Sequence, residues 1–192
     1  EVQHMKRKIC IIGSGSWGAA LAIHIANMGH SVKLWSFSQE EADLINNEHK
    51  CKFLPMATMP KSIKCTTDIE EAVVGSDMIL HVTPSKFTRD TVKKYKDFVE
   101  NQPIILCSKG FEADTLYTLE DVVREEMPNA KLGVLTGPSH AEEVSLGIPT
   151  AIVIASQSLD VQYSVQDTLM NENLRIYTSS DVKGAELGGA LK

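Results

Sequence analysis

Short apolar runs that alternate with amphipathic stretches dominate the pattern of hydrophobic and polar positions along this chain. The first run, 9–12, has no polar alternation, which is typical of a strand buried on both faces, as in a parallel sheet. The stretch 16–28 is rich in helix formers and apolar on most sides, so it predicts a buried helix that ends at Gly29. Further strands are expected at 31–35, 78–82, 104–107, 131–135, 150–155 and 175–178.

Helices are predicted between most of these strands. Residue spacing and capping residues place them at 39–47, 69–74, 116–126, 159–170 and 181–192. Two more are expected, an amphipathic helix opened by Pro84 and Ser85, and a helix that follows the turn at 136–143 and ends near Gly147. The proline-containing stretch 50–64 is expected to be a loop, and Lys93, Lys94 and Lys96 are interpreted as a solvated helix face. Strands that alternate with helices favour a Rossmann-like, doubly wound α/β fold with a mostly parallel sheet and helices on both faces.

The glycines between the first strand and the first helix give the most specific signal in the chain. Gly13, Gly15 and Gly18 follow a strand and open a helix, which is the context that a dinucleotide-binding glycine motif needs. Gly13 permits a tight turn, Gly15 lets a pyrophosphate approach the backbone, and Gly18 lets the helix pack on the strand. The amides of Ser16 and Trp17 lie at the helix N-terminus, where the helix dipole favours an anion. The alternative is a glycine turn that only packs the helix.

Composition and charge narrow the classes of partner. The 192 residues are 43% hydrophobic, enough for one substantial domain with a full core. A net charge of −6, with acids and bases interspersed, argues against nucleic acid as a partner. No apolar run approaches membrane-spanning length, so no membrane insertion is expected. The cysteines and histidines show no metal-ligand spacing, so no metal is expected, and the cysteines are interpreted as reduced, buried thiols of a cytoplasmic protein.

Loops at the carboxyl ends of the strands are expected to share one crevice, because open α/β sheets bind ligands there. These loops are 13–18, 83–85, 108–110 and 137–139. Lys109 is the one cation in their sequences, and a lysine in such a place can hold a phosphate or polarise a carbonyl group. The alternative for Lys109 is an ordinary exposed loop lysine.

The last predicted helix contains an unusual glycine spacing. Gly184, Gly188 and Lys192 are four residues apart, so they share one stripe of the helix. A glycine inside a helix costs about 1 kcal/mol and is tolerated where another backbone or a ligand approaches closely. Lys192 would then lie in a crowded, partly dry space, where a lysine can act as a base. The alternative is a terminal lysine that complements the helix dipole.

Four motifs together resemble the bacterial type of NAD(P)-dependent glycerol-3-phosphate dehydrogenase. They are Gly-Ser-Gly-Ser-Trp-Gly at 13–18, Ser-Lys-Gly-Phe-Glu at 108–112, Gly-Pro-Ser-His-Ala-Glu-Glu at 137–143 and Glu-Leu-Gly-Gly-Ala-Leu-Lys at 186–192. Many dehydrogenases share the first motif, whereas the last two together are quite specific. The resemblance spans essentially 5–192 and implies an NAD(P)-binding Rossmann domain over 5–180. It also implies that 181–192 begins the helix leading into a helical substrate domain, which this chain lacks.

The resemblance implies a reversible hydride transfer that interconverts dihydroxyacetone phosphate and sn-glycerol 3-phosphate with NAD or NADP as cofactor. This reaction supplies glycerophospholipid biosynthesis, and the phosphorylated small molecule is the expected partner. The chain alone is expected to be inactive, and a homodimer is expected for the full-length protein. Two alternatives stay open: another dehydrogenase of the 6-phosphogluconate or hydroxyacid type, and a non-catalytic dinucleotide-sensing domain. The presence of both Lys109 and Lys192 favours the enzyme.

The resemblance also implies roles for individual residues. Lys192 is expected to accept the proton in alcohol oxidation, and Lys109 to act in catalysis while touching both cofactor and substrate. Gly137 and Ser139 are expected to help bind the substrate. The expected cofactor-binding residues are Gly13, Ser14, Gly15, Ser16, Trp17, Gly18, Phe37, Pro84, Phe87, Lys109 and Ala141.

The end of the second strand departs from a common pattern. An NAD-selective site usually has Asp or Glu there to bind the ribose, and an NADP-selective site has a nearby Arg for the 2′-phosphate. The segment Trp-Ser-Phe-Ser at 35–38 contains neither. The sequence therefore leaves the preference between NAD and NADP open.

Overall fold

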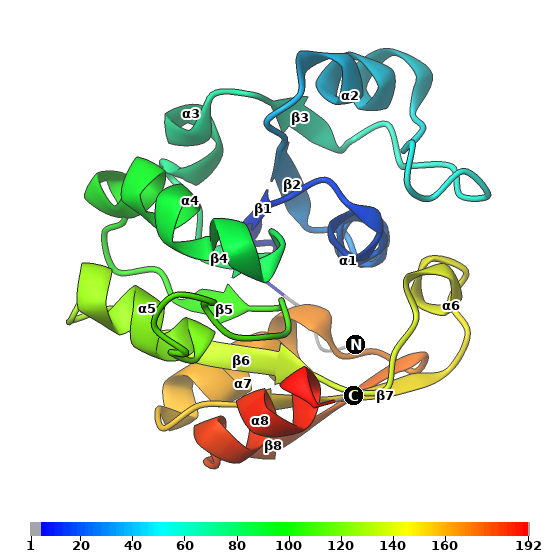
Figure 1. Cartoon of the computed structure of the whole chain (residues 1–192). Helices are drawn as coiled ribbons and strands as arrows, with labels where there is room; N and C mark the ends of the chain where they lie inside the picture. The colour runs from blue at the N-terminus through cyan, green and yellow to red at the C-terminus, as the bar shows by residue number, and fades with distance from the viewer. Residues whose placement is uncertain (1–4, 192) are drawn as a thin grey trace.

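The structure, a computed structural model, describes residues 5–191 and consists of a sheet with helices on both faces (Figure 1). The strands are β1 Lys8–Ile12, β2 Ser31–Trp35, β3 Lys64–Thr66, β4 Met78–His81, β5 Ile104–Leu106, β6 Leu132–Thr136, β7 Thr150–Ala155 and β8 Leu174–Ser179. The α-helices are α1 Ser16–Asn27, α2 Gln39–Asp43, α3 Ile69–Val73, α4 Thr88–Tyr95, α5 Leu119–Glu126, α6 Ala141–Ser145, α7 Leu159–Leu169 and α8 Val182–Ala190. A π-helical turn at Leu44–Glu48 extends α2, and 3-10 turns at Ser85–Phe87 and Lys96–Phe98 flank α4.

The eight strands have the order β3-β2-β1-β4-β5-β6-β7-β8. Strands β1 to β6 pair in parallel, β7 runs antiparallel to β6, and β8 is parallel to β7. The first six strands follow the order of the Rossmann fold, in which the strand order reverses beside β1 and opens a crevice there. The prediction of a doubly wound, mostly parallel sheet is confirmed.

Both faces of the sheet are buried at its central strands, as the apolar run 9–12 predicted. Ile9 and Ile11 of β1 belong to the core that packs against α1 and α7, whereas Cys10 and Ile12 belong to the core against α3, α4 and α5. Figure 1 shows α3, α4 and α5 on the opposite side of the sheet from α1. Burial on both faces fixes the strands, so the loops at their carboxyl ends start from defined positions.

The reversal between β6 and β7 keeps one connection beside the crevice. Because β7 runs antiparallel to β6, the segment 137–149 between them starts and ends at the same edge of the sheet. Its helix α6 packs against α1, where Val144 joins the core (Figure 1). The loop 137–139 therefore lies near the glycine turn that precedes α1.

Most predicted boundaries lie within a residue or two of the observed ones, and two segments differ more clearly. Residues 64–66, whose first residue closed the predicted loop 50–64, form the edge strand β3 and are held extended by pairing with β2. The Asn46 side-chain amide also donates a 2.8 Å hydrogen bond to the Cys65 carbonyl oxygen and accepts one of 2.8 Å from the Cys65 backbone N–H. The helix predicted at 116–126 begins at Leu119, because Leu116 has a φ of +60° and Thr118 caps the helix instead. The local hydrophobic pattern indicates neither the pairing of β3 with β2 nor the helix cap at Thr118.

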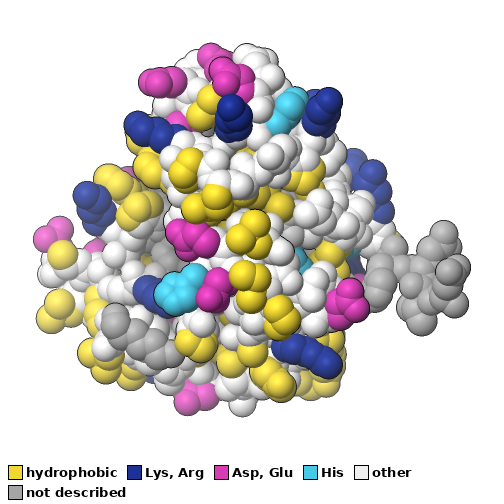
Figure 2. All heavy atoms as spheres, turned by 90° about the vertical axis from the view of Figure 1, so that its right-hand side faces the viewer, with side chains coloured by type: hydrophobic (Ala, Val, Ile, Leu, Met, Phe, Trp, Pro, Cys, Tyr) yellow, Lys and Arg dark blue, Asp and Glu magenta, His cyan; other side chains and the backbone are white. Residues whose placement is uncertain are grey.

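The surface carries charges of both signs. Figure 2 views the side of α1, α2 and α6, and acidic and basic side chains are interspersed among hydrophobic ones on this face. Within residues 5–191, no helix is both long and apolar enough to cross a membrane.

Candidate active site

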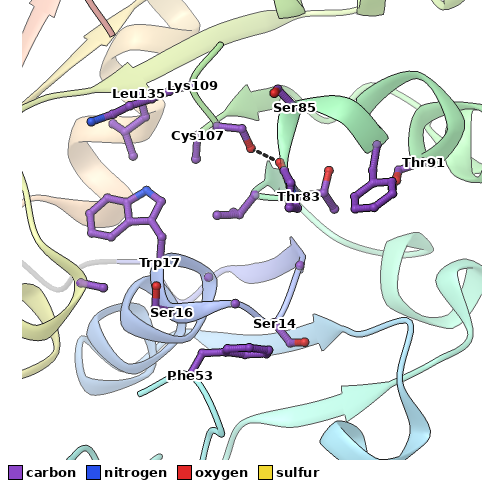
Figure 3. Close-up of a pocket in the computed structure, with 18 of the residues that line it drawn as sticks. Ser14, Ser16, Trp17, Phe53, Thr83, Ser85, Thr91, Cys107, Lys109 and Leu135 are labelled. Atoms are coloured by element: carbon purple, nitrogen blue, oxygen red, sulfur yellow. Dashed lines mark hydrogen bonds between the residues drawn. The ribbon is translucent and has the colours of Figure 1, made fainter. Parts of the chain in front are cut away.

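A cavity of about 940 Å³ lies at the carboxyl ends of β1, β4, β5 and β6 (Figure 3). It occupies the point beside β1 where the strand order reverses, and all four predicted loops contribute to its wall. The structure places there every expected site residue except Lys192, which lies outside the described residues. The expected residues that line the cavity are Gly13, Ser14, Gly15, Ser16, Trp17, Gly18, Phe37, Pro84, Phe87, Lys109, Gly137, Ser139 and Ala141.

The glycine turn presents bare backbone to this cavity. Gly13 has a φ of +125°, and a Cβ there would lie 2.8 Å from the carbonyl oxygen of Val82. A Cβ on Gly18 would clash with the carbonyl oxygen of Gly13, so this glycine permits the helix to pack on the turn. By contrast, a Cβ on Gly15 would meet no atom within 4 Å.

The N-terminus of α1 opens beside Gly15. Gly15 is the N-cap residue, and no side chain caps this helix end. The amides of Ser16 and Trp17 therefore retain the donor capacity that the first turn of a helix leaves unused. No acidic side chain stands in the first turn of α1. Bare backbone, free amides and the positive end of the helix dipole together fit a phosphate or pyrophosphate group.

Lys109 joins two of the loops around the cavity. Its Nζ donates a hydrogen bond of 3.4 Å to the carbonyl oxygen of Gly137, and its side chain is exposed. The neighbouring Ser108 hydroxyl donates to the carbonyl oxygen of Thr83, which ties the loop after β5 to the loop after β4 (Figure 3). An ammonium group in this position can orient a phosphate or stabilise negative charge on a carbonyl oxygen.

His81 does not line the cavity but contacts a residue that does. Its Nδ1 lies 2.8 Å from the Tyr95 hydroxyl, and its Nε2 lies 2.8 Å from Oγ1 of the cavity-lining Thr83. Burial lowers the pKa of His81 to about 4, so the ring is neutral near pH 7. Both ring nitrogens are engaged by protein partners, so His81 has a structural role. Across residues 5–191, no group of His, Cys, Asp and Glu side chains could hold a metal ion.

The glycine stripe of the last helix lies differently from the prediction. Gly184 and Gly188 are exposed, and a Cβ on Gly188 would meet no atom within 4 Å. Gly189 makes the close approach instead, since its Cβ would lie 3.1 Å from Oγ1 of Thr136, with Cγ of Lys109 in ordinary contact at 3.6 Å. The reason is that the face of α8 that packs on the sheet is not the one that carries Gly184 and Gly188. The buried residues of α8 are Val182, Glu186 and Gly189.

Sequence reasoning missed an acidic side chain in the cavity wall. Glu41 of α2 lines the cavity, and its Oε2 accepts hydrogen bonds from the hydroxyls of Ser14, at 2.5 Å, and Ser36, at 2.8 Å. A signal for its position was present, because Ser38 and Glu41 have the spacing of a helix capping box. Ser38 Oγ does accept a hydrogen bond from the Glu41 amide at 3.3 Å. The carboxylate, however, turns to the serines of the crevice.

A lysine and an aromatic ring from outside the four predicted loops also line the cavity. Lys94, interpreted as part of a solvated face, lines the cavity, with its Nζ 5.7 Å from the centre of the Trp35 ring. Phe53, from the predicted loop 50–64, also lines the cavity and is 48% exposed. The expected cofactor contacts Phe37 and Phe87 are 80% and 48% exposed. Aromatic rings thus border the opening, where a planar ring could stack.

Comparisons with known proteins agree with this geometry. The family model described as the N-terminus of NAD-dependent glycerol-3-phosphate dehydrogenase matches residues 8–162. The glycerol-3-phosphate dehydrogenase (NAD(P)+) of Agathobacter rectalis is 46% identical over 187 residues, which cover 96% of this chain and 56% of that protein. A protein of the same name from Fusobacterium nucleatum is 44% identical over 190 residues, covering 96% of this chain and 56% of that protein.

A solved structure shows the same likeness in three dimensions. The crystal structure of glycerol-3-phosphate dehydrogenase from Coxiella burnetii superimposes with a TM-score of 0.91 at 31% identity, covering 96% of this chain and 57% of that one. The chain thus spans about half the length of the relatives it matches. Since the family model matches well over half of its residues, the chain belongs to the family of NAD-dependent glycerol-3-phosphate dehydrogenases, in the N-terminal part.

Proposed function

We propose that this chain is the dinucleotide-binding part of an enzyme that interconverts dihydroxyacetone phosphate and sn-glycerol 3-phosphate with NAD(P)H. One observation carries the proposal: the bare backbone of Gly15 and the ammonium group of Lys109 face the same cavity at the carboxyl ends of the strands. The names of the relatives support it, since they are glycerol-3-phosphate dehydrogenases that use NAD(P)+.

The cavity wall fits the cofactor. The open space at Gly15 and the uncapped start of α1 suit a pyrophosphate, which carries two negative charges close to the backbone. Phe37 and Phe87, with Pro84 and Ala141, would flank the two ends of the dinucleotide. When bound, the reduced nicotinamide supplies a hydride to the carbonyl carbon of the substrate.

Two lysines complete the proposed chemistry. Negative charge develops on the carbonyl oxygen as the hydride arrives, and this oxygen needs a cation and a proton. We assign Lys109 to orienting the substrate and stabilising that charge, because its Nζ bridges to the loop of Gly137 and Ser139. Lys192 is assigned to proton transfer by the family resemblance alone.

The cavity also has apolar walls that would exclude water from the reaction. Trp17, Val82, Leu135 and Ile152 line it, and hydride transfer benefits when water is kept away from the reacting atoms. We place the enzyme in the cytoplasm, a proposal that the four free, buried cysteines support, since reduced thiols are typical of that compartment. A homodimer stays a prediction.

Binding and turnover test the proposal separately. Binding of NADH to the 192-residue chain is measured by quenching of Trp17 and Trp35, the two tryptophans, which both line the cavity. Turnover is measured by consumption of NADH with dihydroxyacetone phosphate, in this chain and in a protein extended to the length of its relatives.

We expect the 192-residue chain to bind NADH with negligible turnover, and the extended protein to reduce dihydroxyacetone phosphate. A panel of other keto substrates distinguishes the alternatives. Faster reduction of a hydroxyacid precursor would favour another dehydrogenase, and binding without turnover of any substrate by the extended protein would favour a sensor.

A further inference from the structure

The carboxylate of Glu41 joins two parts of the cavity that are distant in sequence. Ser14 belongs to the glycine turn, and Ser36 directly follows β2. Both hydroxyls donate to Oε2 of Glu41, at 2.5 and 2.8 Å. Ser14 and Ser36 are 6% and 1% exposed, whereas Glu41 is half-buried and lines the cavity. The two serines thus hold a negative charge at the end of β2.

This position matters in a Rossmann fold. An acidic residue at the end of the second strand binds the ribose hydroxyls of NAD, and its charge disfavours the 2′-phosphate of NADP. In this chain that place in the sequence is taken by Ser36, which has no charge. The structure supplies the missing carboxylate from five residues further along, through helix α2.

The negative charge of Glu41 acts on the groups around it. Burial raises the pKa of the Cys65 thiol to about 12, and the negative charge of Glu41 adds to that shift. Burial likewise raises the pKa of Cys51, with a smaller contribution from Glu41. Among the described residues that line the cavity, the lysines are Lys94 and Lys109. Lys94 comes from α4 and Lys109 from the loop after β5, so neither shares an element with Glu41.

We propose that Glu41 makes this protein select NAD over NADP, by accepting a hydrogen bond from the 2′-hydroxyl of the adenosine ribose and repelling a 2′-phosphate. The proposal rests on the proposed function, because it assumes a dinucleotide in the cavity. The hydrogen bonds from Ser14 and Ser36 both engage Oε2, and none to Oε1 is present among the described residues. Glu41 therefore retains an acceptor atom for the ribose without releasing its two serines.

The test is a comparison of two dissociation constants in the 192-residue chain. Binding of NADH and of NADPH is measured by tryptophan quenching at low salt, for the wild type and for Glu41→Gln. The wild type is expected to bind NADH at least about tenfold more tightly than NADPH, because a doubly charged phosphate meets a carboxylate. Glu41→Gln should tighten NADPH binding about tenfold while changing NADH binding only about threefold.

Two control variants separate this role from general charge and folding effects. Glu40→Gln removes the same charge from the same helix, but Glu40 is exposed and outside the cavity wall, so the NADH to NADPH ratio should stay at the wild-type value. Ser36→Ala keeps the carboxylate but removes one of the two donors that hold it, so rejection of NADPH should weaken, though less than in Glu41→Gln. Thermal unfolding checks that each variant is folded, and Ser36→Ala keeps the test informative should Glu41→Gln unfold.

Each outcome has a distinct meaning. An unchanged ratio in folded Glu41→Gln, a wild type that prefers NADPH, or an equal shift in Glu40→Gln would overturn the proposal. A loss of the wild-type NADPH binding in Lys94→Ala, with no effect of Glu41→Gln, would assign selectivity to Lys94 instead. If the wild type bound neither dinucleotide, the proposed function itself would fail.

Discussion

The guanidinium group of Arg89 binds the carboxylate of Glu112 through two hydrogen bonds, with Nε 2.8 Å from Oε2 and Nη2 2.9 Å from Oε1. Its Nη1 also lies 3.0 Å from Oε1 of Glu126 on α5. The hydrogen bond from Arg89 lowers the pKa of Glu112 to about 2. Glu112 belongs to the loop after β5 that carries Lys109, so α4 and α5 together hold this loop in place.

The first prediction follows from this ion pair. In the extended protein, Arg89→Met should raise the KM for dihydroxyacetone phosphate about tenfold, because the loop that positions Lys109 loses its bidentate anchor. Arg89→Lys should recover only part of the loss, since an ammonium group cannot form the two parallel hydrogen bonds. Steady-state kinetics measures the KM, and tryptophan quenching measures NADH binding, which should be nearly unchanged.

A nearby lysine provides the control for this prediction. Lys93 lies 3.9 Å from Oε1 of Glu126 and is about half exposed, so Lys93→Met removes a positive charge from the same cluster without touching Glu112. Its KM should equal that of the wild type. A wild-type KM in folded Arg89→Met, or an equal loss in Lys93→Met, would show that the ion pair does not position the loop.

The second prediction concerns two glycines of the turn. Gly15→Val should fold normally but lose NADH binding, because its Cβ would meet no protein atom within 4 Å and its side chain would fill the space left for the pyrophosphate. Gly18→Ala should instead reduce stability, since its Cβ would clash with the carbonyl oxygen of Gly13. Thermal unfolding and tryptophan quenching distinguish the two effects. Wild-type NADH affinity in Gly15→Val would remove the glycine turn from the cofactor site.

Where local pattern and global fold agree, the sequence predicted the structure. The buried run 9–12, the glycine turn and the helix after it were predictable, because strand, turn and helix each have their own local signal. The parallel order of the strands followed from their alternation with helices. The edge strand at 64–66 had no such signal, because pairing with β2 rather than its three residues keeps it extended.

In the candidate site, too, the residues with a local signal could be predicted and those positioned by tertiary packing could not. Lys109 could be placed, since it follows an apolar strand directly and the carboxyl end of a strand faces the crevice. The role of Glu41 could not be predicted from the residues at the end of the second strand. Glu41 belongs to the next helix, and its side chain reaches the end of β2 only in the folded structure. Gly189 rather than Gly188 approaches Lys109, since the face that a short helix presents depends on tertiary packing.

The third prediction concerns the dependence of stability on pH. Burial lowers the pKa of His81 from 6.5 to about 4, so between these values the unfolded chain binds a proton that the folded chain does not. The free energy of unfolding should therefore fall as the pH drops from 6.5 to 4, by up to about 3 kcal/mol from this group. The contribution of the neutral, buried His81 to the free energy of unfolding is fully present above pH 6.5.

Urea unfolding at several pH values measures this effect. His81→Gln should be less stable at pH 7.5 but should lose less stability on acidification, because its amide does not titrate. His140→Gln changes an exposed histidine and should keep the wild-type slope. The buried His24, whose pKa is lowered mainly by burial, titrates in the same direction and remains in both variants. Equal slopes in the wild type and His81→Gln would contradict the assignment.

The last prediction concerns Lys109 itself. Its Nζ donates to the carbonyl oxygen of Gly137, and Gly189 of α8 packs beside its stem, so its position is fixed by two other elements of the cavity. An ammonium group held near the carbonyl oxygen of the substrate stabilises the charge that develops there and also binds the ground state. Lys109→Ala in the extended protein should therefore lower kcat about 100-fold and raise the KM for dihydroxyacetone phosphate about tenfold.

Three measurements define this role. Lys109→Arg keeps the charge but changes its geometry, so it should recover the KM more fully than kcat. Lys131→Ala removes an exposed lysine just before β6 and should leave both constants unchanged. NADH binding by Lys109→Ala, measured by tryptophan quenching, should weaken less than substrate binding, because the backbone of the glycine turn holds most of the dinucleotide charge. If Lys109→Ala kept the wild-type kcat and KM, Lys109 would be an ordinary exposed loop lysine, and the cation beside the carbonyl oxygen would have to come from another part of the protein.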